Sequence, residues 1–168
     1  MSQRLIDRLR PTRRLLGTVL EAEPAWLLAR SMKTLEVRMA RHNANAQAVA
    51  EWLARDARVS RVLYPGLPSH PDHQIAKSQM RGFGGMVTFD LDGDYDRAAR
   101  FFDRIEVFKR ATSLGGVESL CGLPVLTSQF GWSDEQMAQA DVTKGMVRLS
   151  VGLEDPDDLV ADLDRALS

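Results

Sequence analysis

The sequence predicts an α+β fold, in which helices alternate with a few separate strands. Residues 24–55 repeat apolar side chains at helical spacing, and a second helical stripe closes the chain. Two short segments, MVTFDLDG from residue 86 and MVRLSVG from residue 146, have the apolar pattern of strands. The 168 residues are about the size of one domain and 44% of them are hydrophobic, so we expect a packed core.

The longest helix is expected at residues 24–55. Pro24 suits a first helical turn, and acidic residues just before it favour the positive end of the helix dipole. The apolar stripe that we expect to be buried consists of Leu28, Met32, Leu35, Met39, Val49 and Leu53. The arginines of residues 4–14 are interpreted as one solvated helix face, rather than as a transit peptide.

The middle of the chain predicts a strand between helices. A proline-rich loop at 64–73 leads to a short helix at 74–80, and the strand at 86–91 has one apolar face. Asp94 or Asp96 is expected to cap the next helix. That helix is expected to pack through Ala98, Ala99, Phe102 and Ile105. Residues 107–111 follow as a strand, and the glycine-rich residues 113–120 as a turn.

The last third predicts two capped helices around a strand. Residues 121–132 have no regular pattern, and Ser133 with Gln136 resembles a capping box. After the strand at 146–152, Asp155 is expected to cap the final helix, with Pro156 in its first turn. The core stripe of this helix is expected to consist of Leu159, Val160, Leu163 and Leu167.

The composition argues against several classes of function. Lys and Arg number 22 against 23 Asp and Glu, so we expect no nucleic-acid partner. No apolar run approaches the roughly 20 residues that span a bilayer, so we expect no membrane partner either. Cys121 is the single cysteine, which excludes an intrachain disulfide and indicates a reducing, cytoplasmic location.

Few residues offer catalytic chemistry. The three histidines, His42, His70 and His73, are interpreted as surface or packing residues. The His-x-Asp-His spacing at residues 70–73 could ligate a metal, but it is weak evidence, and we expect no metal site. Neither a dinucleotide-binding pattern nor a P-loop is present.

Two features remain as candidate binding sites. In Thr112-Ser113-Leu114-Gly115-Gly116 the glycines allow close approach of a ligand, and a hydroxyl and amide groups could face an anion. Arg148 is the only charge in an apolar strand and needs a carboxylate or phosphate partner. From the residues alone, an internal salt bridge to Glu118 or Glu154 is favoured over a ligand.

Longer motifs occur in a definite order along the chain. They are LLARSMKTLEVRMARHNANAQAVAEWL, VLYPGLPSHPDHQIAKSQMRGFGGMVTF, TSLGGVESL and MVRLSVGLEDPDDLVADLDRAL. From about Leu15 onward the sequence resembles the trans-sulfuration (Cys/Met metabolism) family of pyridoxal-phosphate enzymes, of the cystathionine γ-synthase, γ-lyase and β-lyase type. The resemblance implies the small C-terminal domain of a fold-type I enzyme, with a long N-terminal helix and further helices on a small, mainly antiparallel sheet.

The same resemblance implies a substrate site. In the family, pyridoxal phosphate acts as an electron sink for β- or γ-elimination or replacement on sulfur amino acids. The family's carboxylate-binding arginine falls on Arg148 and its signature serine on Ser113, with Leu114 beside it. Thr112 stands where cystathionine-handling members often carry a glutamate, which leaves the sulfur amino acid open. With this resemblance, the ligand role of Arg148 is favoured over the salt bridge.

The family's Schiff-base lysine is not matched in this chain. The four lysines are Lys33, Lys77, Lys109 and Lys144, and none has the family's sequence context. We therefore expect no catalytic residue and no cofactor bound by this chain alone, with pyridoxal phosphate held in the complete enzyme.

The expected domain boundaries follow from the same resemblance. Residues 1–23 are expected to link to a large cofactor domain that is missing here, and residues 24–168 to form the substrate-binding domain. A truncated gene, a split gene or an excised domain would explain this organisation. The expected partners are a small amino acid, a separately encoded large domain and further copies in a homo-oligomer. The alternative is a non-catalytic remnant or a subunit-interaction module.

Overall fold

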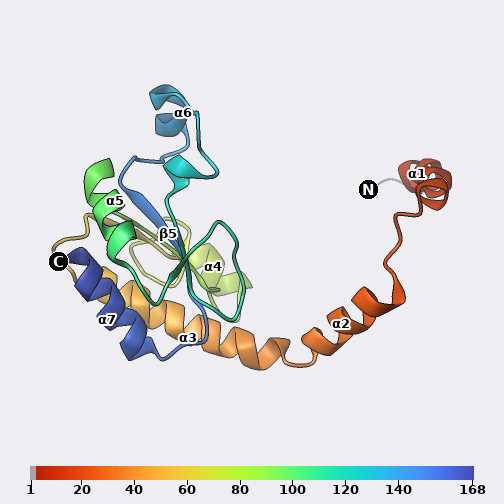
Figure 1. Cartoon of the computed structure of the whole chain (residues 1–168), viewed down its shortest axis with the longest axis horizontal. Coiled ribbons are helices and arrows are strands. Elements are labelled where there is room, and N and C mark those ends of the chain that lie inside the picture. Colours follow the sequence, from red (N-terminus) through yellow and green to blue (C-terminus); the bar gives the residue numbers. More distant parts are fainter. Residues whose placement is uncertain (1–2) are drawn as a thin grey trace. The chain divides into compact units, whose positions relative to one another are not determined.

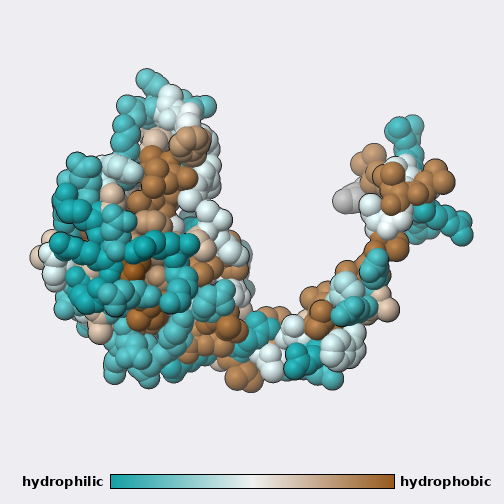
Figure 2. Space-filling view, in the orientation of Figure 1, coloured by the Kyte–Doolittle hydropathy of each residue, from teal (hydrophilic) through white to brown (hydrophobic). Residues whose placement is uncertain are grey.

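The computed structural model describes residues 3–168 and confirms the α+β fold. The chain divides into two compact units at the boundary between Glu36 and Val37. The first unit contains α1 (Gln3–Leu16) and α2 (Ala22–Met32), neither of which has a buried residue. Apolar side chains lie on the surface of both helices (Figure 2). The expected boundary between a linker and a substrate domain, at residues 23 and 24, stays a prediction.

The long helix predicted at 24–55 is interrupted. α2 ends at Met32 and α3 (Leu35–Leu53) begins three residues later. At the break, the Lys33 N–H bonds to the carbonyl of Arg30, three residues back, and the Thr34 hydroxyl donates to the Ser31 carbonyl at 3.4 Å. Such local hydrogen bonds compete with the helical ladder, which explains why residues 33 and 34 form a turn.

The stripe predicted for this helix is buried only in its second half. Val49 and Leu53 are fully buried, whereas Leu28 and Met32 are 55% and 60% exposed. Leu35 and Met39 are also exposed. The prediction was therefore wrong for the first half, whose apolar side chains are exposed in the described chain.

The second unit is built on a five-stranded sheet with the order β1-β2-β5-β4-β3. Its middle strand, β5, is labelled in Figure 1. The strands are β1 (Arg61–Leu63), β2 (Met86–Asp90), β3 (Lys109–Arg110), β4 (Leu120–Gly122) and β5 (Met146–Ser150). Only β3 and β4 pair in parallel. The alternation in 86–91 and the apolar run at 146–152 thus correctly predicted the two central strands. β1 and β4 were not predicted, and the strand expected at 107–111 is reduced to two residues.

One face of the sheet forms the core with α3, α5 (Tyr95–Arg104) and α7 (Pro156–Leu167). α4 (His73–Gln79), the 3₁₀ helix η1 (Pro124–Leu126) and α6 (Asp134–Gln139) complete the unit. The residues that pack at the centre of this core are Val49, Leu53, Val87, Phe89, Phe101, Val147, Leu149, Leu159 and Leu163. Phe101, which was not predicted, is buried on α5, while the predicted Ala99 and Phe102 are only half-buried.

Capping residues fix where the helices begin. The Asp94 carboxylate accepts from the amides of Asp96 and Arg97 at 2.8 and 3.1 Å, which resolves the choice between Asp94 and Asp96. The capping box of Ser133 and Gln136 is present, and the Asp155 side chain accepts from the Asp157 amide. These predictions from the sequence are confirmed. In the described part of the chain, no helix is long and apolar enough to span a membrane.

Candidate functional site

Arg148 lies at the middle of β5, where it is half-buried and points out from the core. Its neighbours in the pairing register are Thr88 on β2 and Gly122 on β4. From there the guanidinium reaches the loop after β3, where Nη2 donates to the carbonyls of Thr112 at 2.5 Å and Ser113 at 3.2 Å. Three of the predicted site residues, Thr112, Ser113 and Arg148, are therefore brought together.

Gly122 on β4 leaves room for the Arg148 guanidinium to reach from β5 to the loop after β3. A Cβ at this position would lie 3.3 Å from the Ala111 carbonyl oxygen and 3.9 Å from Arg148 Nη2. Any larger side chain would extend into the space beside the guanidinium. Gly122 was not predicted from the sequence, because its importance comes from a neighbouring strand and not from a local motif.

The loop that carries Ser113 is fixed to the end of β5. The Gly115 amide donates to the Ser150 hydroxyl at 2.9 Å, and the Leu153 amide donates to the Val117 carbonyl at 2.8 Å. Gly115 has φ +75°, a left-handed conformation that favours glycine. The turn predicted at 113–120 is therefore a loop held at defined points, and the position of Ser113 depends on them.

Glu154 closes the other end of the same loop. Its carboxylate accepts from the Ser119 amide at 2.7 Å and from the Ser119 hydroxyl at 2.8 Å. The Gly152 amide in turn donates to the Ser119 hydroxyl at 2.7 Å. Asn45 on α3 donates to the carbonyls of Gly152 and Glu154. Since hydrogen bonds to a carboxylate are stronger than neutral ones, Glu154 is the main clamp on this loop.

The internal salt bridge considered for Arg148 is not formed. Within residues 3–168, no carboxylate oxygen lies within ion-pair distance of its guanidinium. The Glu154 carboxylate is occupied by Ser119 instead, and the Glu118 carboxylate lies beside Gly116. Leu114 is exposed at the edge of the same loop.

Cys121 neighbours this site on β4 but faces the core. Burial is the main cause that raises the pKa of its thiol, and the carboxylate of Asp162 adds to this effect. The positive charges of Arg110 and Arg148 act in the opposite direction and do not compensate. Cys121 is therefore a packing residue and not a nucleophile.

The lysines do not fit a Schiff-base site for pyridoxal phosphate. Lys144 Nζ is paired with Asp134 Oδ1 at 2.8 Å, and Lys109 Nζ donates to the Glu106 carbonyl at 3.4 Å. Lys33 lies in the turn after α2 and Lys77 on α4, both exposed. No cofactor chemistry is therefore assigned to the lysines of this chain.

The histidines have structural contacts. His42 is 4% exposed, and its Nδ1 lies 2.7 Å from the Val151 carbonyl oxygen. His73 Nδ1 lies 2.7 Å from the Pro65 carbonyl oxygen, and His70 Nδ1 accepts from the Asp72 amide. Among the residues that the structure describes, no group of three or more His, Cys, Asp or Glu side chains is placed to hold a metal ion.

Comparison with known proteins identifies the family. The family model "Cys/Met metabolism PLP-dependent enzyme" matches residues 1–168. The chain is 45% identical to L-methionine gamma-lyase of Pseudomonas putida and 44% identical to cystathionine gamma-lyase of Mus musculus, over 99% of its length in both cases. It spans 42% of the length of each of these relatives.

The fold agrees with this result. The structure superposes on the crystal structure of a cystathionine gamma-lyase from Micromonospora echinospora with a TM-score of 0.89, at 40% sequence identity. The match covers 99% of this chain and 43% of that one. The sequence motifs, the sheet and the whole-length match agree, and the chain belongs to the Cys/Met metabolism family of PLP-dependent enzymes.

Proposed function

We propose that this chain provides the substrate-carboxylate site of a trans-sulfuration enzyme, a carbon–sulfur lyase or γ-replacement enzyme for cystathionine, homocysteine or a related amino acid. One observation carries the proposal: Arg148 is held by two backbone carbonyls and by no carboxylate in the described residues. A guanidinium fixed in this way keeps its charge available for an anionic ligand. The α-carboxylate of an amino acid is such a ligand.

The geometry of Arg148 supports two-point recognition. Both hydrogen bonds come from Nη2, and within residues 3–168 neither Nε nor Nη1 makes one. A planar guanidinium can present two parallel N–H groups to one carboxylate. The Ser113 hydroxyl and the neighbouring loop amides would add donors beside it. Holding the carboxylate at these points orients the Cα–H bond, which is the contribution that we assign to Arg148, Ser113, Leu114 and Thr112.

The remaining chemistry is assigned to a partner. When bound, pyridoxal phosphate supplies the electron sink for bond cleavage at the substrate. We propose that a separate large domain, which holds the cofactor and its lysine, packs against this chain, and that the assembly is a homo-oligomer. The exposed apolar side chains of the first unit support a partner surface, because large uncovered patches mark interfaces. They include Leu15, Leu16, Trp26, Leu28 and Met32.

The proposal is tested by Arg148→Lys in a complex of this chain with the large domain of a relative. Lysine keeps the charge but loses the two-point fork, so kcat/KM for the amino acid should fall about 100- to 1000-fold. The absorbance of the bound cofactor should not change, because we assign Arg148 to the substrate carboxylate. Ser113→Ala should cost less, since backbone amides can share its role.

The matched control is Arg61→Lys. Arg61 lies on β1 in the same sheet and pairs with Asp141, so this variant makes the same chemical change away from the site. It should leave kcat/KM within about twofold, since exposed ion pairs contribute little. If Arg148→Lys lowers thermal stability but leaves kcat/KM of the folded protein unchanged, Arg148 is a structural residue and the assignment is wrong.

A further inference from the structure

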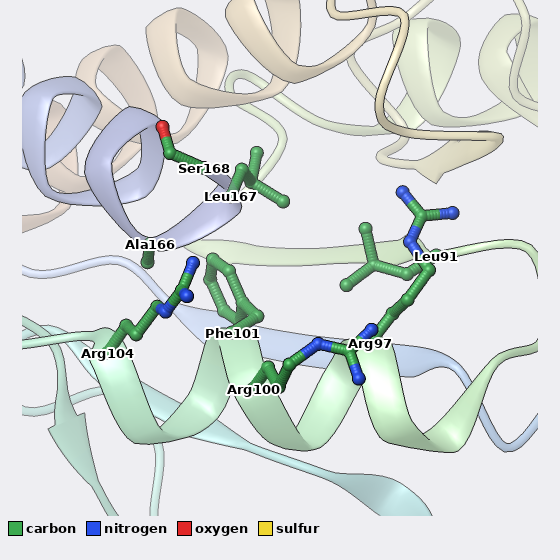
Figure 3. Close-up of a pocket in the computed structure, with 8 residues that line it drawn as sticks. All are labelled: Leu91, Arg97, Arg100, Phe101, Arg104, Ala166, Leu167 and Ser168. Carbon is green, nitrogen blue, oxygen red and sulfur yellow. The ribbon is translucent and has the colours of Figure 1, made fainter.

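A hollow lies between α5 and the end of α7. Three arginines of α5, Arg97, Arg100 and Arg104, line it. Figure 3 shows Arg97 and Arg104 extending from α5 on either side of Phe101, with Arg100 between them along the outside of the helix. The other lining residues are Leu91, Ala166, Leu167 and Ser168. No residue of the Arg148 site takes part.

The three arginines differ in whether a carboxylate is paired with them. Arg97 is paired with Asp92 at 2.5 Å and donates to the Arg58 carbonyl at 2.9 Å. For Arg100 and Arg104, the described residues offer no carboxylate within ion-pair distance. These two arginines are four residues apart on α5, a spacing at which like charges destabilise a helix. An anion placed between them would remove this repulsion.

The apolar residues give the hollow a fixed floor. Leu91 and Phe101 are each 1% exposed and belong to the core, so they do not move aside for a ligand. The space is about 170 Å³, below the roughly 300–1,000 Å³ typical of pockets for drug-sized ligands. One tetrahedral oxyanion fits this space.

We propose that this hollow binds phosphate, either as the free anion or as the phosphate group of a small monoester. The guanidinium groups of Arg100 and Arg104 would each donate to phosphate oxygens, while Arg97, whose charge is paired with Asp92, would border the site. Arginine suits this role because its planar fork matches the spacing of phosphate oxygens. The site is independent of the function proposed for Arg148, so either can fail without the other.

A structural role for the same arginines makes a different prediction. Arg104 lies in the last turn of α5, where a positive charge favours the negative end of the helix dipole. If this were the whole explanation, removal of Arg104 would destabilise the phosphate-free chain, and phosphate would bind no better than chloride. Binding and stability therefore have to be measured separately.

The test is titration of the isotopically labelled 168-residue chain with inorganic phosphate at constant ionic strength, followed by NMR. Amide signals of α5 and of the last turn of α7 should shift along one saturable curve. The double substitution Arg100→Gln and Arg104→Gln should raise the Kd at least about tenfold, since two charge-assisted contacts are lost. Glutamine has a helix propensity close to that of arginine, so α5 should persist.

Two controls locate the binding. Arg55→Gln with Arg81→Gln removes the same charge from exposed positions elsewhere, and Arg148→Gln removes the proposed substrate anchor. Both should leave the Kd within about twofold, because the arginines that line the hollow are unchanged. A phosphomonoester added to the phosphate-bound chain should displace phosphate if the hollow accepts both ligands. The proposal is overturned if phosphate produces no saturable shift at α5, if the α5 double variant binds as the wild type does, or if either control loses binding equally.

Discussion

Gly152 connects the strand that carries Arg148 to the loop that carries Ser113. An added Cβ would lie 2.4 Å from the Val117 carbonyl oxygen and 2.6 Å from the Glu118 carbonyl carbon. Both atoms belong to the backbone, so no side-chain rotation can relieve the contact. The substitution Gly152→Ala should therefore push the loop of residues 113–119 away from β5 by about 1 Å, the difference from an ordinary van der Waals contact.

The cost of this displacement can be worked out from the contacts that it disturbs. Overpacking of a closed site typically costs about 1–3 kcal/mol. The hydrogen bond from Gly152 N to Ser119 Oγ and that from Leu153 N to Val117 O contribute about 1 kcal/mol each. We expect a loss of about 3–5 kcal/mol in the free energy of unfolding. With roughly 3 °C of Tm for each kcal/mol in a domain of this size, Tm should fall by about 9–15 °C.

The assay is thermal unfolding followed by far-ultraviolet circular dichroism, with Gly116→Ala as the matched control. Gly116 lies in the same loop, but the three atoms nearest to an added Cβ there all belong to the Glu118 side chain, which can rotate away. Its Tm should change by no more than about 3 °C. If Gly152→Ala unfolds at the same temperature as Gly116→Ala, the loop is not clamped at Gly152.

Two further predictions concern titratable groups. The Arg58 side chain lowers the pKa of Asp56 by hydrogen bonding to its carboxylate. This contribution to stability is present above the unfolded pKa of about 4 and is lost as the pH falls through the folded value. Urea unfolding at a series of acid pH values should show a smaller slope of stability against pH for Asp56→Asn; an unchanged slope would contradict the assignment. Cys121 is fully buried and its pKa is raised, so iodoacetamide should alkylate it at least about 100-fold more slowly in the native chain than in urea. Equal rates would show that β4 opens freely.

The predictions from sequence succeeded where local physics decides the structure. The alternation of Val87 and Phe89 against Thr88 defines β2, because successive side chains of a strand point to opposite faces. The capping box of Ser133 and Gln136 depends on residues three apart, and it is formed as predicted. Each of these signals is contained within a few residues.

The predictions failed where the partner is distant in the sequence. β4 has only Leu120, Cys121 and Gly122, too short a run to show alternation, and all three are buried. Asp162 gives another example: its carboxylate is 3% exposed and accepts from the amides of residues 106–108. Nothing in the helical pattern around residue 162 reveals a buried charge. Only the fold brings it to the amides that compensate its desolvation.

The geometry around the candidate site could be predicted only in part for the same reason. Arg148 and Ser113 could be singled out as a lone charge in an apolar strand and a hydroxyl beside two glycines. The residues that position them could not be predicted, because they come from other parts of the fold. Gly122 lies on β4, Glu154 in the turn before α7 and Asn45 on α3.

Hydrogen bonds among these residues also explain why two motifs that are distant in the sequence are linked in the structure. In TSLGGVESL the last serine is Ser119, and in RLSVGLED the glycine and glutamate are Gly152 and Glu154. These residues bind one another through three hydrogen bonds of 2.7–2.8 Å. The first motif therefore presents Ser113 at a position that the second motif fixes, while the second motif also carries Arg148. A change in either motif would move one of the two groups relative to the other, so the proposed carboxylate site depends on both motifs folding as one unit.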